Sequence, residues 1–278
     1  MEECVIKIAG HTMGTPELSL VQAIGLFAKL GLDGLEVICC EGYKCGVTLR
    51  IPTRDLRGIK RRAADQGLVM VGLVPYTKDL DHPEQVARRR AITQLKMAVD
   101  LALALECPSI RILAGREASA AERPAALQRL VDALSEVGEY ARAAGTQLNV
   151  ENHMDTMATS AAATMEIIRA MNSPNVGVLY DQANLSHLRQ ESPDEAIALQ
   201  WPYIRHVHVK DFYWRGEERR ATLLGQGIVP WRAIVDRLRV LGYDGYYSLE
   251  YERRWFPDQL PPAEIGMRRG VEFLRGIV

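Results

Sequence analysis

Residues 241–250 read Leu-Gly-Tyr-Asp-Gly-Tyr-Tyr-Ser-Leu-Glu, and this stretch contains the unit from which we predict the fold. Gly242 ends an amphipathic helix, a short turn follows, and a β-rich apolar run then ends in a carboxylate. Short apolar runs of this kind are typical of strands that are buried in parallel sheets. The stretch therefore predicts a helix, a turn and a buried parallel strand that ends near Glu250.

The same unit recurs along the chain, with a glycine before each apolar run: Gly31 before 34–37, Gly67 before 68–71, and Gly145 before 147–150. Counting such runs gives eight strands, near 5–11, 34–39, 68–75, 109–114, 147–153, 176–181, 204–210 and 246–251. Alternating strands and helices predict parallel pairing with right-handed crossovers, and eight parallel strands close a barrel. A doubly wound open sheet is the main alternative, but no Gly-rich phosphate loop follows the first strand.

The length of the chain agrees with one large domain. Its 278 residues are close to the roughly 250 residues typical of such a barrel, and no linker or low-complexity tract interrupts them. We therefore predict an α/β fold with a single (β/α)8 TIM barrel domain over residues 1–278. Three helix starts carry their own signals, which are Thr15-Pro16, Ser192-Pro193 with Glu195 in a capping box, and Pro230.

Composition narrows the kinds of partner. Lys and Arg number 34 against 35 Asp and Glu, so the formal net charge of −1 gives no field that attracts nucleic acid or an acidic membrane. No segment reaches the roughly 20 apolar residues of a membrane span, and the N-terminus lacks a secretory signal. The five cysteines have no zinc-type spacing, which predicts reduced thiols in a cytoplasmic protein: Cys4, Cys39, Cys40, Cys45 and Cys107.

Four consecutive predicted strands end in residues with metal-binding side chains, which are Glu151, Asp181, His208 and Glu250. The carboxyl ends of barrel strands meet at one mouth, where active sites of this fold lie. Each carboxylate alone fits a salt-bridged or exposed residue, but three together repel one another, and we expect the nearby strands to offer few cations. Three oxygen donors and one imidazole therefore predict one divalent ion, Mn²⁺ or Mg²⁺ first, with Zn²⁺, Co²⁺ or Fe²⁺ as alternatives.

Other polar residues near the strand ends are weaker candidates, each with a structural alternative. Strand alternation places His153 on the face of Glu151, so its ring is predicted to point into the mouth or to form a hydrogen-bonded wall. His11 either contacts substrate or caps the barrel. Lys210 and Arg215 either hold hydroxyl, carboxylate or phosphate groups of a substrate or are exposed charges. The remaining polar and aromatic candidates are assigned to buried hydrogen bonding, packing or a solvated surface: Glu36, His206, the four tryptophans and the basic run 88–90.

Several segments resemble the xylose-isomerase-like sugar isomerase/epimerase superfamily. They are the pairing of Glu151 with Asp181, His208-Val209-Lys210-Asp211, and the stretches 225–231 and 242–250. The resemblance implies that Glu151, Asp181, His208 and Glu250 bind one metal, with Mn²⁺ expected, and that the two glutamates relay the proton in an epimerase. Two positions depart from the pattern of many relatives: Asn184, at a substrate-binding position, replaces a His, and Gln226 replaces a Glu.

The function that the resemblance implies is a sugar, keto-sugar or cyclitol isomerase or epimerase. It abstracts a proton next to a carbonyl and passes through a metal-stabilised enediolate. The alternative is a lyase of the same fold, either inosose dehydratase-like or the catalytic subunit of a 3-keto-glycoside C- or O-deglycosidase, with His153 as acid or base. A homo-oligomer or a complex with a small second subunit is expected.

Two further classes are weighed against these. Apurinic-site endonucleases share the barrel but need extra histidines at the ends of the early strands, where this chain has Pro75-Tyr76 and Ala114-Gly115. A barrel that binds a sugar or a partner without turnover also stays open, and failure of turnover across a broad panel of polyols and keto-sugars would support it.

Overall fold

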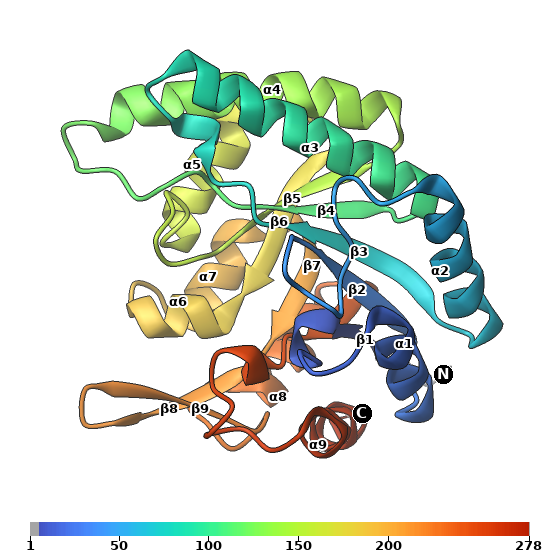
Figure 1. The fold of residues 1–278 in the computed structure, drawn as a ribbon. Helices are drawn as coiled ribbons and strands as arrows, with labels where there is room; N and C mark the ends of the chain where they lie inside the picture. The colour runs from blue at the N-terminus through green and yellow to red at the C-terminus, as the bar shows by residue number, and fades with distance from the viewer. Residues whose placement is uncertain (1–5, 278) are drawn as a thin grey trace.

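The computed structural model describes residues 6–277, and its centre is a closed barrel of eight parallel strands. Around the barrel the order is β1-β10-β7-β6-β5-β4-β3-β2, so chain neighbours lie side by side as Figure 1 shows. This confirms the predicted fold class. The barrel strands are β1 (Lys7–His11), β2 (Gly34–Cys39), β3 (Val69–Pro75), β4 (Ser109–Ile112), β5 (Gln147–Glu151), β6 (Val176–Asp181), β7 (Ile204–Val209) and β10 (Tyr246–Leu249).

Helices follow the strands and surround the barrel (Figure 1). Their apolar faces bury the outward side chains of the strands in one continuous core. They are α1 (Leu20–Lys29), α2 (Thr53–Asp65), α3 (Gln85–Leu105), α4 (Arg123–Ala143), α5 (Ala161–Met171), α6 (Gln182–Leu188), α7 (Pro193–Gln200), α8 (Trp231–Val240) and α9 (Ala263–Arg275), with the short 3₁₀ turns η1 (Thr12–Gly14), η2 (Asp79–Asp81) and η3 (Glu252–Arg254).

Two of the three predicted helix starts are confirmed and one is wrong. Ser192 and Glu195 form the predicted reciprocal capping box of α7, and Pro230 is the N-cap of α8. Thr15 instead closes η1. Helix α1 begins at Leu20, because Ser19 and Gln22 form the capping box there.

An antiparallel hairpin that the sequence analysis missed follows β7. Its strands are β8 (Asp211–Arg215) and β9 (Glu218–Thr222), and it projects from the barrel in Figure 1. Asp211 fixes the loop after the hairpin: its carboxylate accepts hydrogen bonds from the backbone N–H groups of Gly225 and Gly227, both at 3.0 Å, and of Val229 at 3.2 Å. A Cβ on Gly227 would lie 2.1 Å from Asp211 Oδ1. The tight packing explains the Gly-x-Gly sequence there.

Three further predictions concern the cysteines, membrane-spanning segments and the number of domains. Cys39, Cys40, Cys45 and Cys107 are free thiols, while Cys4 and residue 5 of the first predicted strand lie outside the described residues. Within residues 6–277, no helix has both the length and the apolarity to cross a membrane. The assignment of all 278 residues to one domain stays a prediction.

Candidate metal and substrate site

Four side chains converge at the mouth of the barrel from the carboxyl ends of β5, β6, β7 and β10. They are Glu151, Asp181, His208 and Glu250, and all four are buried. One potential ligand atom from each lies within 4.8 Å of the others. The residues that the sequence analysis chose as metal ligands are therefore brought together in one place.

His208 is oriented so that one ring nitrogen faces the carboxylates. Its Nε2 donates a hydrogen bond to Glu36 Oε2 at 2.9 Å, and Ser248 Oγ donates to the same oxygen at 2.7 Å. Because a carboxylate accepts, Nε2 carries the proton, and in the neutral ring Nδ1 presents a lone pair. A carboxylate behind a histidine is the usual support for a metal-binding imidazole.

Two buried polar atoms of the cluster have no hydrogen-bond partner, namely His208 Nδ1 and Glu151 Oε1. They lie 3.3 Å apart, and His208 Nδ1 is 3.5 Å from Glu250 Oε2. Burial lowers the pKa of His208, but Glu36 and Glu250 raise it well above its usual value, so without a metal a proton on Nδ1 faces Glu151 Oε1. A divalent ion bound by both atoms would take the place of that proton. Oxygen and imidazole donors at this spacing fit a divalent ion.

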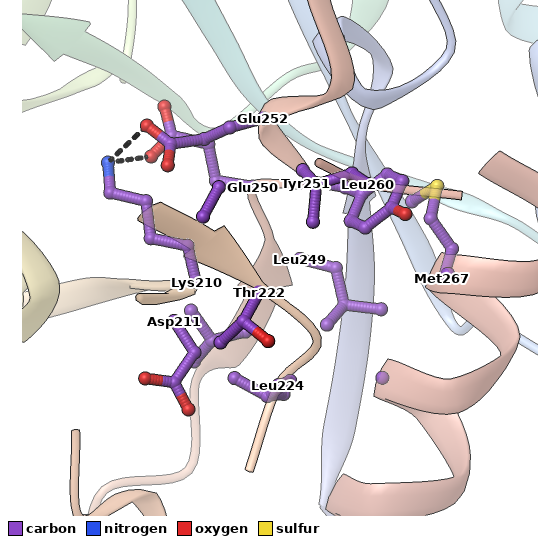
Figure 2. A pocket seen from close by; sticks show the side chains of 14 residues that line it. Lys210, Asp211, Thr222, Leu224, Leu249, Glu250, Tyr251, Glu252, Leu260 and Met267 are labelled. Carbon is purple, nitrogen blue, oxygen red and sulfur yellow. Dashed lines mark hydrogen bonds and ion pairs between the residues drawn. The ribbon is translucent and has the colours of Figure 1, made fainter. Parts of the chain in front are cut away.

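We predicted few cations near the carboxylates, and this prediction is wrong. Lys210 Nζ lies 2.7 Å from Asp181 Oδ2, and it also pairs with Glu250. Figure 2 shows the same amino group reaching toward Glu250 and Glu252. The case for a metal therefore depends on the unpaired donor atoms rather than on unbalanced negative charge. Lys210 is buried and pairs with these carboxylates, so it is not the exposed charge that was the alternative, and its role in holding substrate stays a prediction.

Arg111 is a residue of the site that the sequence analysis missed. It is buried in β4, where Nη1 donates to Glu151 Oε2 at 2.9 Å and Nη2 donates to the carbonyl of Pro75 at 2.9 Å. The pair leaves the other oxygen of Glu151, Oε1, directed at the cluster. A signal was available, because a charged residue between Ile110 and Ile112 in a buried strand requires a partner.

The neighbouring charges keep both glutamates ionised. Burial would raise the pKa of Glu151, but the charge of Arg111 lowers it to about 2. Burial would likewise raise the pKa of Glu250, but Lys210 and then His208 hold it well below its usual value. In Asp181 burial prevails and raises the pKa to about 6. Glu151 and Glu250 thus stand as carboxylates that can accept a proton.

Asn184 supports Asp181. Its side-chain amide donates to Asp181 Oδ2 at 3.0 Å and to the carbonyl of Asn152 at 2.9 Å, and its backbone N–H donates to Asp181 Oδ1 at 2.9 Å. Asn184 Oδ1 is buried without a hydrogen-bond partner. Asn184, which we predicted to bind substrate, therefore orients Asp181, and its Oδ1 remains available to accept a hydrogen bond.

His11 lies at the end of β1 with its ring 5.6 Å from that of His208, measured between centroids. Its Nδ1 accepts a hydrogen bond from the backbone N–H of Met13 at 3.0 Å, while Nε2 is buried without a partner. Burial lowers the pKa of His11 to about 4, so the ring is neutral near pH 7. With Nδ1 accepting, the proton is on Nε2, which is a free donor.

His153 lies beyond the strand on which we placed it. β5 ends at Glu151, so the predicted alternation does not extend to His153, which is half-buried in the following loop. Its Nδ1 hydrogen bonds the carbonyl of Met154, so Nδ1 carries the proton and Nε2 has a lone pair. Burial lowers the pKa of His153, while the charge of Glu151 raises it and that of Lys210 lowers it further.

Arg215 ends β8 and is exposed on the hairpin, and no hydrogen bond or ion pair joins its side chain to another residue of the described chain. The structure does not bring it to the cluster.

A methionine and three aromatic side chains contact one another beside the cluster. Met13 Sδ lies 3.5 Å from the hydroxyl of Tyr76 and 3.3 Å from Trp255 Nε1. Tyr43 stacks on Tyr76 with 6.1 Å between ring centroids. Met13, Tyr43, Tyr76 and Trp255 therefore form a wall beside the cluster, and only Trp255 was among the predicted candidates.

Comparison with known proteins places the chain in a family. Residues 24–277 match the family model described as xylose isomerase-like TIM barrel. The chain belongs to this family. It is 30% identical to the L-ribulose 3-epimerase of Mesorhizobium japonicum over 205 residues, which cover 70% of this chain and 66% of that protein. It is 22% identical to the fructoselysine 3-epimerase of Shigella flexneri over 252 residues, or 88% of this chain and 90% of that one.

A lyase is also among the relatives. The inosose dehydratase of Lacticaseibacillus casei is 25% identical over 156 residues, which cover 51% of each chain. Among solved structures, a D-psicose 3-epimerase from Clostridium cellulolyticum with D-tagatose superimposes with a TM-score of 0.80 at 18% identity, covering 98% of this chain and 99% of that chain. The family thus includes sugar epimerases and dehydratases, which supports an enzyme that acts on sugars.

Proposed function

We propose that the chain is a divalent-metal-dependent epimerase or isomerase of a sugar or keto-sugar that removes a proton from the carbon next to a carbonyl. The observation that carries the proposal is the buried cluster at the barrel mouth, in which His208 Nδ1 and Glu151 Oε1 have no hydrogen-bond partner. The epimerases among the relatives support the reaction class.

Glu151, Asp181, His208 and Glu250 would hold the ion, with Mn²⁺ expected and Mg²⁺, Co²⁺, Zn²⁺ or Fe²⁺ as alternatives. Such an ion, when bound, polarises a substrate carbonyl and lowers the free energy of the enediolate that forms on proton loss. The donor set fits this ion because three of the four side chains offer oxygen and the fourth offers an imidazole whose tautomer is fixed by Glu36.

The remaining chemistry belongs to side chains of this chain. Glu151 ends β5 and Glu250 follows β10, two strands that are not neighbours in the barrel. Both are ionised, so one can take a proton from the substrate carbon and the other can return one. Arg111 fixes one oxygen of Glu151, so the other keeps its direction. His11 Nε2–H is a donor for a substrate oxygen, and we expect His153 to position a hydroxyl group.

A lyase is the second candidate, and the protonation of the His153 ring supports it. A neutral imidazole whose Nε2 has a lone pair can accept the proton from the carbon next to the carbonyl and then, as the imidazolium, donate it to the departing group of an elimination. Either an inosose-like dehydration or cleavage of a 3-keto-glycoside, in complex with a small second subunit, would use it in this way. The similarity to inosose dehydratase supports the first of these.

The proposal is tested by assaying the purified chain on keto-sugars and cyclitol ketones in deuterium oxide, before and after chelation. We expect turnover that chelation abolishes and that Mn²⁺ restores, with deuterium entering the carbon next to the carbonyl. An epimer as the only product supports the first candidate, whereas a second organic product or a dehydrated ketone supports the lyase. Unlabelled product, or full activity after chelation, would contradict both.

A further inference from the structure

A cavity of about 560 Å³ opens at the carboxyl ends of β2 and β3, outside the cluster of metal-ligand candidates. Its lining includes Cys39 and Pro75, which end these strands, together with Leu49 and Arg50 before α2 and Met97 of α3. This volume lies within the roughly 300–1,000 Å³ of sites that bind small molecules. The roles proposed for the cluster do not use it.

The cavity adjoins the cluster through one residue. Tyr76 lines the cavity, and its ring lies over the guanidinium of Arg111, 4.4 Å from the guanidinium carbon to the ring centroid. Arg111 also donates to the carbonyl of Pro75, another lining residue, and holds Glu151. The cavity and the cluster therefore share a wall at the same end of the barrel, where substrates of this fold bind.

Two arginines that line the cavity have no partner among the described residues. Neither Arg50 nor Arg90 makes a hydrogen bond or ion pair within residues 6–277, although both line the cavity. The neighbours of Arg90 in the basic run 88–90 are engaged: Arg88 donates to the carbonyls of His82 and Pro83, and Arg89 pairs with Glu136. Glu41 also lines the cavity, so the two arginines leave a net positive charge.

We propose that this cavity is a distal subsite for an anionic extension of the substrate, with Arg50 and Arg90 binding a carboxylate or phosphate on that extension. A guanidinium group offers paired donors that match both anions. The assignment rests on the proposed function, because the sugar unit is taken to occupy the cluster and the extension to pass Tyr76 into the cavity. The substrate is then a sugar conjugate rather than a free monosaccharide.

The binding test uses the metal-loaded protein and three fragments: phenyl phosphate, benzoate and phenol. We expect the anions to bind between Arg50 and Arg90 in soaked crystals and phenol to bind more weakly. The double variant Arg50→Gln/Arg90→Gln is expected to lose roughly tenfold or more in anion affinity, and Arg89→Gln, the control from the same helix, to lose none. Equal affinity in wild type and double variant, or binding at the cluster alone, overturns the subsite. The stronger fragment identifies the anion.

The substrate test compares methyl 3-keto-β-D-glucoside with its 4-carboxyphenyl and 4-phosphonooxyphenyl counterparts. We expect one anionic conjugate to have at least a roughly tenfold higher kcat/KM than the methyl compound. Thr93→Trp, which fills the cavity from α3, should remove that preference, and Leu103→Trp, at an exposed position of the same helix, should keep it. Equal kcat/KM for all three compounds in the wild type contradicts the inference. Turnover of no keto-sugar, with fragment binding intact, would count against the proposed function and not against the anion site.

Discussion

The two halves of the barrel mouth differ in what they contribute. The half built from β5, β6, β7 and β10 contains the carboxylates, His208 and Lys210, every one of them buried and held by a neighbour. The half built from β1, β2 and β3 contributes His11 and Glu36, which lie against His208, together with Met13, Tyr76 and the large cavity. The contrast indicates that the candidate metal ligands are confined to one half, while the other half supports His208 through Glu36 and shapes the space for the substrate.

β4 joins the halves through Arg111. Its guanidinium holds Glu151 on one side and lies under Tyr76 on the other. Replacements in the half with the carboxylates should therefore change metal binding and turnover. Replacements in the other half should change substrate preference. A replacement of Arg111 should strongly change metal binding and turnover.

The largest effect is expected from removing a ligand candidate. His208→Ala or Asp181→Asn should lower metal occupancy, and turnover should fall by at least about 10³-fold, because a bound metal contributes several kcal/mol to such reactions. Metal analysis alongside kinetics measures both. Trp255→Phe, in the wall that contacts Met13, is the control and should keep its metal. Full metal occupancy and normal turnover in both ligand variants would contradict the assignment of metal binding to this half of the barrel mouth.

Arg111→Met should have the next largest effect. It leaves Glu151 buried and ionised without its partner, which typically costs about 3–5 kcal/mol of folding free energy. In protein that folds, we expect metal affinity to fall by about 10–100-fold, as for other residues that orient ligands. Denaturant unfolding and calorimetric metal titration measure these quantities. Arg111→Lys, which keeps the charge, should recover part of the loss, whereas equal losses in both variants would show that charge plays no part.

His153→Ala distinguishes the two reaction classes at a smaller scale. If the chain is an epimerase, the ring only positions a hydroxyl group, and kcat should fall by a few-fold with the metal content unchanged. A loss of about 10²–10⁴-fold at unchanged metal content is instead the size expected for a proton-transfer residue and would favour the lyase. Steady-state kinetics on metal-loaded protein decide between them.

The smallest effect is expected at Arg215. Its side chain is exposed on the hairpin, so Arg215→Gln should change stability by no more than about 0.5 kcal/mol and leave kcat/KM within about twofold. A clear rise in KM would show that the hairpin folds over the substrate and would restore the original interpretation of this residue.

The sequence predicted those parts of the site that follow from local patterns and missed those that depend on contacts between residues far apart in the chain. The strand ends at Glu151, Asp181 and Glu250 were found because a carboxylate after an apolar run is a local signal. The pairing of Arg111 with Glu151 joins residues 40 positions apart, and no local pattern specifies it. His153 was misplaced because β5 ends two residues earlier than its apolar pattern indicates, and the capping box at Ser19 was overlooked in favour of a nearby proline.

The central claim is that Glu151, Asp181, His208 and Glu250 bind one divalent ion. The most direct measurement is anomalous diffraction at the manganese edge from crystals of chelated and Mn²⁺-reloaded protein. We predict one anomalous peak within about 2–2.5 Å of a ligand atom from each of the four side chains, absent after chelation. No peak there, with turnover undiminished in the chelated protein, would contradict the account.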